Sequence, residues 1–205
     1  VDSKSELSLK PKHENGSLTR AAYEESGGVL GALGDRADNI YKGLSEADQA
    51  ITRQLFMRLV TLGEGAGDTR RRVPLSELEE LDFGTQDDAN EKTIVSRQSA
   101  IINEFGKYRL LAFDRDPITR APTVEVSHEA LLREWKQLRT WLLKSRDDIR
   151  LQRALAVEAA GWSTTQDDSY LLRGSRLAQY EGWRETTAVV LTINEQAYLQ
   201  ASVEH

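Results

Sequence analysis

Between residues 108 and 127 the hydrophobic pattern of this chain changes from a helical period to a period of two. Residues 108–114 and 123–127 are strand-like, and the intervening residues 116–122 begin with aspartate and contain two prolines, which favour a turn. Two short strands joined by a turn form a β-hairpin. Because helical patterns lie on both sides, the sequence predicts one small hairpin within a mainly helical fold.

Helices are expected before the hairpin at residues 18–25, 29–42, 75–81 and 87–105, with a further four-turn helix beginning near residue 45. The hydroxyl of Ser45 can cap the free N–H groups of that further helix. Its apolar residues Ile51, Leu55 and Leu59 then repeat at helical spacing. Residues 72–74 are expected to be extended, because proline disfavours helical angles in the residue before it.

The chain after the hairpin is also expected to be helical, at residues 128–146, 149–162 and 175–184 and from residue 192 onward. Ser127 can cap the first of these helices. One face of that helix collects the apolar residues Leu131, Trp135, Leu138 and Leu142. Thr192 and Glu195 have the spacing of a capping box at the start of the last helix.

The order of these elements favours one architecture. Helix, short strand, helix, helix and hairpin over residues 45–127 is the order of a winged helix-turn-helix. We therefore predict a mainly α protein, in which a winged helix-turn-helix with a small β-hairpin is flanked by helical segments. The expected domains are a polar leader at 1–17, a helical segment at 18–44, the winged helix-turn-helix at 45–127 and a helical linker domain at 128–205.

Composition excludes several classes of protein. Among 205 residues there are 33 acidic and 27 basic side chains and no cysteine. Disulfides, thiolate metal sites and a cysteine nucleophile are therefore excluded, and a reducing, cytoplasmic setting is expected. Apolar runs such as residues 188–191 fall far short of the roughly 20 residues that cross a bilayer, so no membrane partner is expected. The first residue is not Met, so we expect the sequence to begin inside a longer chain.

The sequence lacks the motifs of a catalytic site. A phosphate-binding P-loop needs a lysine followed by serine or threonine after its glycines, whereas residues 63–68 read GEGAGD and are interpreted as an interhelical loop. His13, His128 and His205 are too dispersed for a zinc site, and no G-x-S-x-G elbow is present. We predict no enzyme activity, no catalytic residue, no metal and no cofactor for this segment by itself.

Two features remain as candidate binding residues. His128 lies where the second strand gives way to a helix, and the free N–H groups of a first helical turn favour phosphate. The alternative is a histidine that caps or packs at this junction. Arg70, Arg71 and Arg72 form a basic triplet that can contact phosphate or an acidic partner surface. The alternative for the triplet is a solvated loop edge.

DNA binding is considered because winged helices often read DNA. Residues 45–127 hold 11 basic and 15 acidic side chains. A duplex binder usually presents a basic face, because counterion release supplies much of its affinity. The charge therefore disfavours DNA as a partner. A DNA-binding winged-helix transcriptional regulator and a plain protein-interaction scaffold remain the alternative functions.

Three blocks of the sequence resemble the C-terminal half of the novel STAND NTPase domain. They are residues 18–73, which open with LTRAAYEESGGVLGALGDRADNIYKGLSEADQ, residues 124–142, VEVSHEALLREWKQLRTWL, and residues 171–183, LLRGSRLAQYEGW. The resemblance covers residues 18–202. Domains of this kind occur in large bacterial signalling proteins, often ahead of WD-type β-propeller repeats.

The resemblance implies a nucleotide-dependent switch. In STAND proteins a P-loop module, a helical lid and a winged helix close over ADP at rest, and exchange for ATP permits oligomerisation. Residues 18–44 would be the tail of the lid. In related families a Met-His-Asp motif places its histidine on the β-phosphate, and the matching residues here are Ser127, His128 and Glu129. The resemblance thus implies that His128 senses nucleotide, although serine and glutamate replace the flanking residues.

The sequence as a whole predicts a non-catalytic regulatory segment of a bacterial STAND signal-transduction NTPase. Its expected partners are a P-loop ATPase module of the same chain, a downstream WD-repeat propeller and further copies of itself. ADP or ATP with Mg²⁺ is expected in the parent protein.

Overall fold

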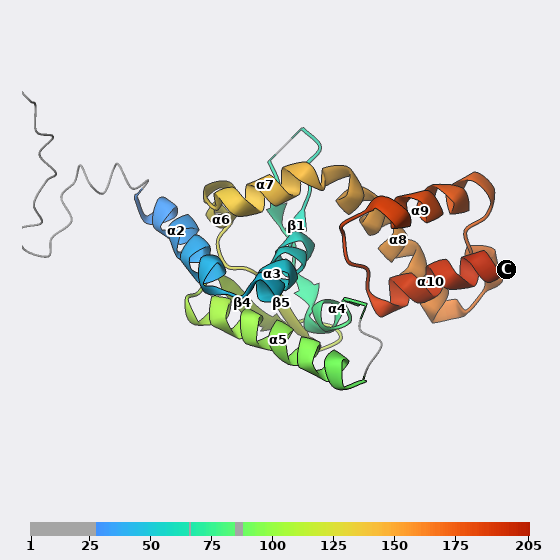
Figure 1. Cartoon of the computed structure of the whole chain (residues 1–205), viewed down its shortest axis with the longest axis horizontal. Coiled ribbons are helices and arrows are strands. Elements are labelled where there is room, and N and C mark those ends of the chain that lie inside the picture. Colours follow the sequence, from blue (N-terminus) through green and yellow to red (C-terminus); the bar gives the residue numbers. More distant parts are fainter. Residues whose placement is uncertain (1–27, 66, 85–87) are drawn as a thin grey trace, which may run out of the picture.

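The computed structural model describes residues 28–65, 67–84 and 88–205 (Figure 1). Within this part the chain is mainly helical, with one two-stranded and one three-stranded antiparallel sheet. The predicted fold class, mainly α with a small β-hairpin between helical segments, is confirmed. The helix expected at residues 18–25 and the polar leader at 1–17 lie outside the described residues.

The elements follow the predicted order. The first part contains α2 (Gly28–Gly43), α3 (Glu46–Arg58), β1 (Val60–Thr61), β2 (Thr69–Arg70), β3 (Val73–Pro74), α4 (Leu75–Glu79), α5 (Asp88–Lys107), β4 (Leu111–Arg115) and β5 (Pro122–Val126). The second part contains α6 (Ala130–Glu134), α7 (Lys136–Lys144), α8 (Arg146–Thr165), the 3₁₀ turn η1 (Asp168–Tyr170), α9 (Gly174–Thr186) and α10 (Ile193–Glu204). The order over residues 45–127 is the one predicted apart from the additional strands β1 and β2, and the winged helix-turn-helix assignment stays a prediction.

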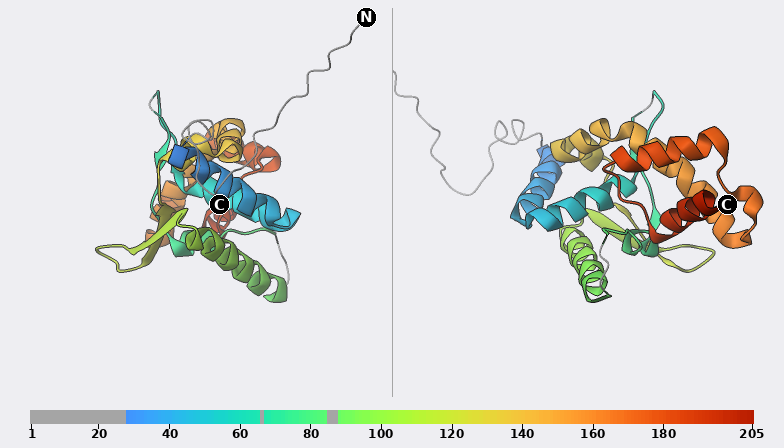
Figure 2. Two further views of the ribbon diagram at one scale, coloured as in Figure 1. Left: turned by 90° about the vertical axis from the view of Figure 1, so that its left-hand side faces the viewer. Right: turned by 45° about the vertical axis from the view of Figure 1, so that its right-hand side comes forward.

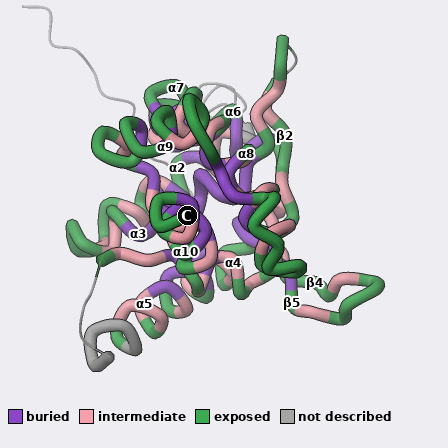
Figure 3. Tube along the Cα trace, turned by 90° about the vertical axis from the view of Figure 1, so that its right-hand side faces the viewer, coloured by how far each residue is buried: buried purple, intermediate pink, exposed green. Residues whose placement is uncertain are grey.

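The predicted hairpin is present and forms the sheet with β3. Strand order is β3-β5-β4, all antiparallel, with Leu111 opposite Val126 at the base of the hairpin. Asp116 closes the turn, because its Oδ1 accepts hydrogen bonds from the backbone N–H groups of Ile118 and Thr119 at 2.9 and 2.7 Å. The hairpin extends away from the body of the molecule (Figure 2), and its tip is exposed (Figure 3).

A second, shorter hairpin replaces the interhelical loop expected at residues 63–68. Val60 pairs with Arg70 and Thr61 with Thr69, so the glycine-rich segment joins β1 to β2. Asp68 Oδ1 accepts a hydrogen bond from the backbone N–H of Gly63 at 2.9 Å. The interhelical interpretation is therefore wrong. Strands of two residues are too short to show a period, so the sequence pattern carries no signal for them.

The single helix expected at residues 128–146 is broken in two. Trp135 has φ −79° and ψ 98°, which ends α6 and starts α7. This turn brings the fully buried indole against Phe56, at 4.8 Å between ring centroids, and Trp141, at 5.3 Å. Aromatic packing thus outweighs the helical propensity of the segment. Ser127 does not cap α6, because the N-cap residue is Glu129, without a side-chain capping bond.

Helix α2 packs across the break between α6 and α7. Gly34 faces this break, and a Cβ at Gly34 would lie 2.6 Å from the carbonyl oxygen of Glu134. Only a glycine permits this close approach of the two backbones. On the core side of α2, Ala37 is buried, and Leu33 and Ile40 contact the core.

The buried apolar residues form two clusters. The first cluster, which we call the aromatic core, contains Phe56, Phe105 and Trp135, reaches from α2 to the start of α8 and also includes Val189 from the segment before α10. The second, the C-terminal core, contains Leu155, Tyr180, Trp183 and Tyr198 from α8, α9 and α10. Figure 1 shows α9 and α10 beside α8, on the side of the molecule away from α2.

A buried ion pair lies between the two cores. Arg58 on α3 donates from Nη1 and Nη2 to the two carboxylate oxygens of Glu195 at 2.9 and 2.8 Å, and both side chains are 3% exposed. Gln152 Nε2 donates to Glu195 Oε1 at 2.6 Å. Glu195 also completes the capping box with Thr192 that the sequence predicted. We call Arg58, Gln152 and Glu195 the polar seam.

Candidate functional site

His128 lies in the short link between β5 and α6. Its backbone carbonyl accepts a hydrogen bond from the N–H of Leu131 at 2.9 Å, which fixes the first turn of the link. Its side chain is exposed, and none of the residues that the structure describes donates to or accepts from the imidazole. The imidazole is therefore free to contact a group outside this fold.

Arg70 is held beside this histidine. Strand β2 carries the guanidinium to the end of β5, where Nη1 donates to the carbonyl oxygens of Val126 at 3.2 Å and Ser127 at 3.1 Å. These are the two residues that immediately precede His128. The structure thus brings together His128 and one member of the arginine triplet, which lie far apart in sequence. The result is a cation bound to the backbone immediately before the exposed His128.

The other two arginines of the triplet have different neighbours. Arg71 makes a bidentate ion pair with Glu77 at 2.7 and 2.9 Å. Arg72 reaches across the sheet to Asp114 at 3.1 Å and Glu125 at 3.2 Å. Both pairs lie within the fold, so of the triplet only Arg70 contacts the segment that presents His128.

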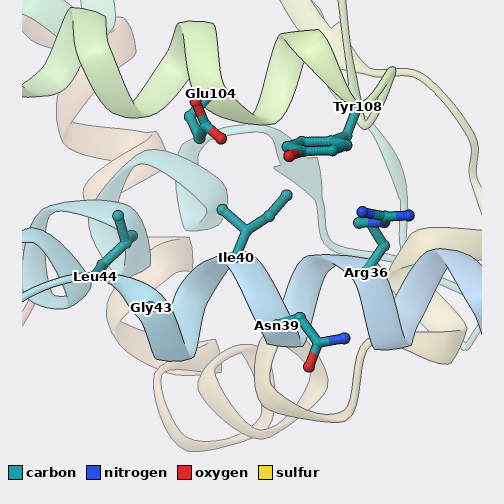
Figure 4. Close-up of a pocket in the computed structure, with 7 residues that line it drawn as sticks. All are labelled: Arg36, Asn39, Ile40, Gly43, Leu44, Glu104 and Tyr108. Atoms are coloured by element: carbon teal, nitrogen blue, oxygen red, sulfur yellow. The ribbon is translucent and has the colours of Figure 1, made fainter.

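A groove of about 400 Å³ lies between α2 and the C-terminal end of α5 (Figure 4). Ile40 points from α2 toward Glu104 and Tyr108. The guanidinium of Arg36 lies 4.8 Å from the centroid of the Tyr108 ring, in a cation–π contact. The groove therefore has an apolar floor with one cation and one carboxylate at its edges. This composition is suited to contact with another protein.

Sequence reasoning missed this groove. Tyr108 was assigned to a strand, whereas it follows the end of α5 and is exposed. Its partners Arg36 and Ile40 belong to α2, which lies far before Tyr108 in the sequence. No local pattern reports such a pairing, because it depends on how α2 is placed against α5.

Two basic side chains of α5 pair within the fold. Arg97 Nε donates to Asp48 Oδ1 at 2.7 Å, and Lys107 pairs with Glu104 at 2.7 Å. Burial alone would raise the pKa of Asp48, but hydrogen bonds from Ser45 and Arg97 lower it below its usual value. Neutralised in this way, Arg97 and Lys107 present little free positive charge to a duplex.

Among the residues that the structure describes, no group of three or more His, Cys, Asp or Glu side chains could hold a metal ion. Within the same ranges, no helix combines the length and apolarity that a bilayer span requires.

The family of the chain follows from its sequence as a whole. The sequence model of the family described as Novel STAND NTPase 1 matches residues 6–170, which is most of the chain. The chain therefore belongs to the Novel STAND NTPase 1 family, and the predicted resemblance is confirmed. No curated protein and no solved structure matches it.

Proposed function

We propose that this segment is a non-catalytic regulatory part of a bacterial STAND signal-transduction NTPase. In this proposal residues 18–44 are the tail of the lid, 45–127 the winged helix and 128–205 a helical linker. The segment packs against a separate P-loop module, and ADP or ATP with Mg²⁺ on that module decides whether the contact is kept. Membership of the family supports the link to this class of NTPase.

The observation that carries the proposal is the setting of His128. Its side chain is exposed, yet the backbone before it is held by Arg70. A histidine that stabilised the fold would be buried or would have a partner within it. A side chain on a rigid backbone is instead preorganised for a group outside the fold. A phosphate of ADP is such a group, because imidazole and guanidinium both donate to it.

The proposed switch needs two states of similar free energy. Nucleotide can shift the equilibrium only by the difference between its affinities for the two states. One charge-assisted hydrogen bond from His128 to ADP contributes about 1.5–3 kcal/mol, which is roughly a ten- to hundredfold effect on the equilibrium. A single histidine can therefore account for a useful part of such a switch.

Replacement of His128 by alanine tests the proposal. The experiment uses the longer protein in which a P-loop module precedes this segment, and it follows the release of bound ADP. We expect His128→Ala to accelerate release by about tenfold or more, because one hydrogen bond to the phosphate is lost. His205→Ala is the matched control, since His205 is exposed at the end of the chain. Equal release rates in the two variants would refute the nucleotide-contact role.

The alternative functions give different outcomes. A DNA-binding regulator requires salt-dependent association with a DNA duplex, and no binding at low salt dismisses it. A plain interaction scaffold predicts that neither the nucleotide nor His128 alters partner binding. The WD-repeat propeller and the cytoplasmic location stay predictions.

A further inference from the structure

Three arginines on α8 lie on the face of the helix that is turned toward the β1–β2 hairpin. Arg146, Arg150 and Arg153 are spaced at i, i+4 and i+7, so they share one face of the helix. Arg146 Nη2 donates to the carbonyl oxygen of Gly63 at 2.6 Å and to Asp68 at 2.9 Å. Arg146 is thus hydrogen-bonded to the loop of the hairpin.

Arg153 is hydrogen-bonded to the base of the same hairpin. Arg153 Nη2 donates to the carbonyl oxygens of Met57 at 3.2 Å, Arg58 at 2.9 Å and Val60 at 3.3 Å. Arg150 differs from both, because its Nη1 pairs with Asp147 on the same helix at 2.9 Å. The side chain of Asp147 is 91% exposed. Among the residues described, Arg150 makes no hydrogen bond to the hairpin, although its charge helps to lower the pKa of Asp68.

A pocket of about 500 Å³ lies beside Arg150. It is lined by Thr61, Leu62, Glu64, Arg71, Arg150 and Arg153. Three of these six side chains are guanidinium groups and one is a carboxylate. The pocket is therefore a concave surface on which positive charge exceeds negative charge.

Carboxylates next to the lining reduce this excess, since Asp147 pairs with Arg150 and Glu77 with Arg71, but neither pairs closely with Arg153. Glu77 Oε1 lies 3.7 Å from Arg153 Nη1, but both oxygens of Glu77 already bind Arg71. Arg153 Nη1 is buried and has no hydrogen-bond acceptor within the described residues. Burial, followed by the charges of Arg71 and Arg58, lowers the pKa of Arg153 to about 9. An added anion would relieve this repulsion between cations.

We propose that this pocket binds the phosphate group of a small anionic ligand, which Arg71, Arg150 and Arg153 contact together. Phosphate has more acceptor oxygens and more negative charge than a carboxylate, so it can satisfy several planar guanidinium groups at once. The carboxylate of Glu64 also lines the pocket and opposes the anion. This site is separate from His128 and does not depend on the proposed function.

Titration with inorganic phosphate tests this site. The 205-residue chain is titrated at constant ionic strength, with chloride replaced, and the side-chain Nε–H signals of the arginines are followed by NMR. Saturable shifts at Arg71, Arg150 and Arg153 are expected. An absence of saturation, or equal shifts with acetate, would overturn the assignment. Arms with ADP and with adenosine show whether the phosphate of a nucleotide is taken in preference to the free ion.

Matched variants locate the binding. Arg150→Gln should weaken phosphate binding by about fivefold or more, because it removes a guanidinium that the fold does not need. Arg184→Gln removes the same charge from an exposed position on α9, outside the pocket lining, and should have no effect. Glu64→Gln should strengthen binding. Equal weakening by Arg150→Gln and Arg184→Gln would show nonspecific attraction and refute the site. His128→Ala should leave phosphate binding unchanged, which separates this test from that of the proposed function.

Discussion

The aromatic core and the C-terminal core are built differently. The aromatic core joins elements that are distant in sequence, and five aromatic rings meet within it: Tyr41, Phe56, Phe105, Trp135 and Trp141. The C-terminal core joins consecutive helices α8, α9 and α10. Both sequence-predicted binding features, His128 and the triplet at residues 70–72, belong to the elements around the aromatic core. In the function proposed here the first region therefore carries the contact surface, and the second region packs behind it.

The connection between the two regions includes buried polar contacts beside the packing of Val189. Arg58 and Glu195 are bonded across 137 residues of sequence, and Gln54 reaches the segment before α10 through the carbonyl of Ala188 and the N–H of Val190. Buried charges specify one geometry, since any displacement leaves them without partners. The polar seam therefore fixes how the C-terminal helices lie against α3.

The largest loss of stability is expected on truncation of the aromatic core. Trp135→Ala should lower the free energy of unfolding by about 3–5 kcal/mol, because it removes a fully buried ring that contacts four others. The matched change in the C-terminal core, Trp162→Ala, removes a half-buried ring and should cost about half as much. Urea denaturation followed by circular dichroism gives both values. Equal losses would contradict the difference between the two cores.

Breaking the polar seam should cost about 3 kcal/mol. Glu195→Ala leaves the Arg58 charge buried without its bidentate partner, although Glu77 lies 3.6 Å away. Amide hydrogen exchange should show α10 losing protection before α3 does. The double variant Arg58→Met with Glu195→Leu should recover much of the loss, because it removes both charges. Protection lost uniformly over the chain would argue against a seam between two regions.

Acid should weaken the first region through Glu77. Burial alone would raise the pKa of Glu77, but hydrogen bonds and charge from Arg71, with the charges of Arg58 and Arg153, lower it below its usual value. A lowered pKa contributes stability that is present above the ordinary carboxyl range and is lost as pH falls through the folded-state value. Glu77→Gln should therefore be less stable at pH 7 and show a flatter loss of stability below about pH 4.5. An equal loss of stability with falling pH in the unaltered chain and in Glu77→Gln would contradict this role of Glu77.

The smallest effects separate the two helix caps. Ser45 caps α3 at the surface, where its Oγ accepts from the N–H of Asp48 at 3.2 Å. Thr192 caps α10 in a buried capping box that shares Glu195 with the seam. Ser45→Ala should cost about 0.5–1 kcal/mol and Thr192→Ala up to about 2 kcal/mol. Thermal unfolding measures both losses, and a larger loss for Ser45→Ala would reverse the expected order.

Local sequence patterns predicted the features that depend on neighbouring residues. The Asp116 turn, the cap at Ser45 and the box at Thr192 are of this kind, because each partner lies within three residues. The break at Trp135 was missed, since no proline or glycine marks it and only the aromatic core explains it. The β1–β2 hairpin was missed because its strands are too short to show alternation.

The same division applies to the candidate sites. His128 was found from its position after a strand and from the family resemblance. Its neighbour Arg70 was found as part of a triplet, but their proximity depends on strand β2 reaching the end of β5. Glu195 was recognised only as a capping residue, and its ion pair with Arg58 has no local signal. The pocket beside Arg150 likewise requires α8 to lie along the short hairpin.

The most direct test of the account is the affinity between this segment and a P-loop module of its family, measured with ADP or with a non-hydrolysable ATP analogue bound. We expect the ADP-bound module to bind at least about tenfold more tightly, and His128→Ala to abolish that difference. Equal affinities for the two nucleotide states of the module would contradict a nucleotide-dependent contact.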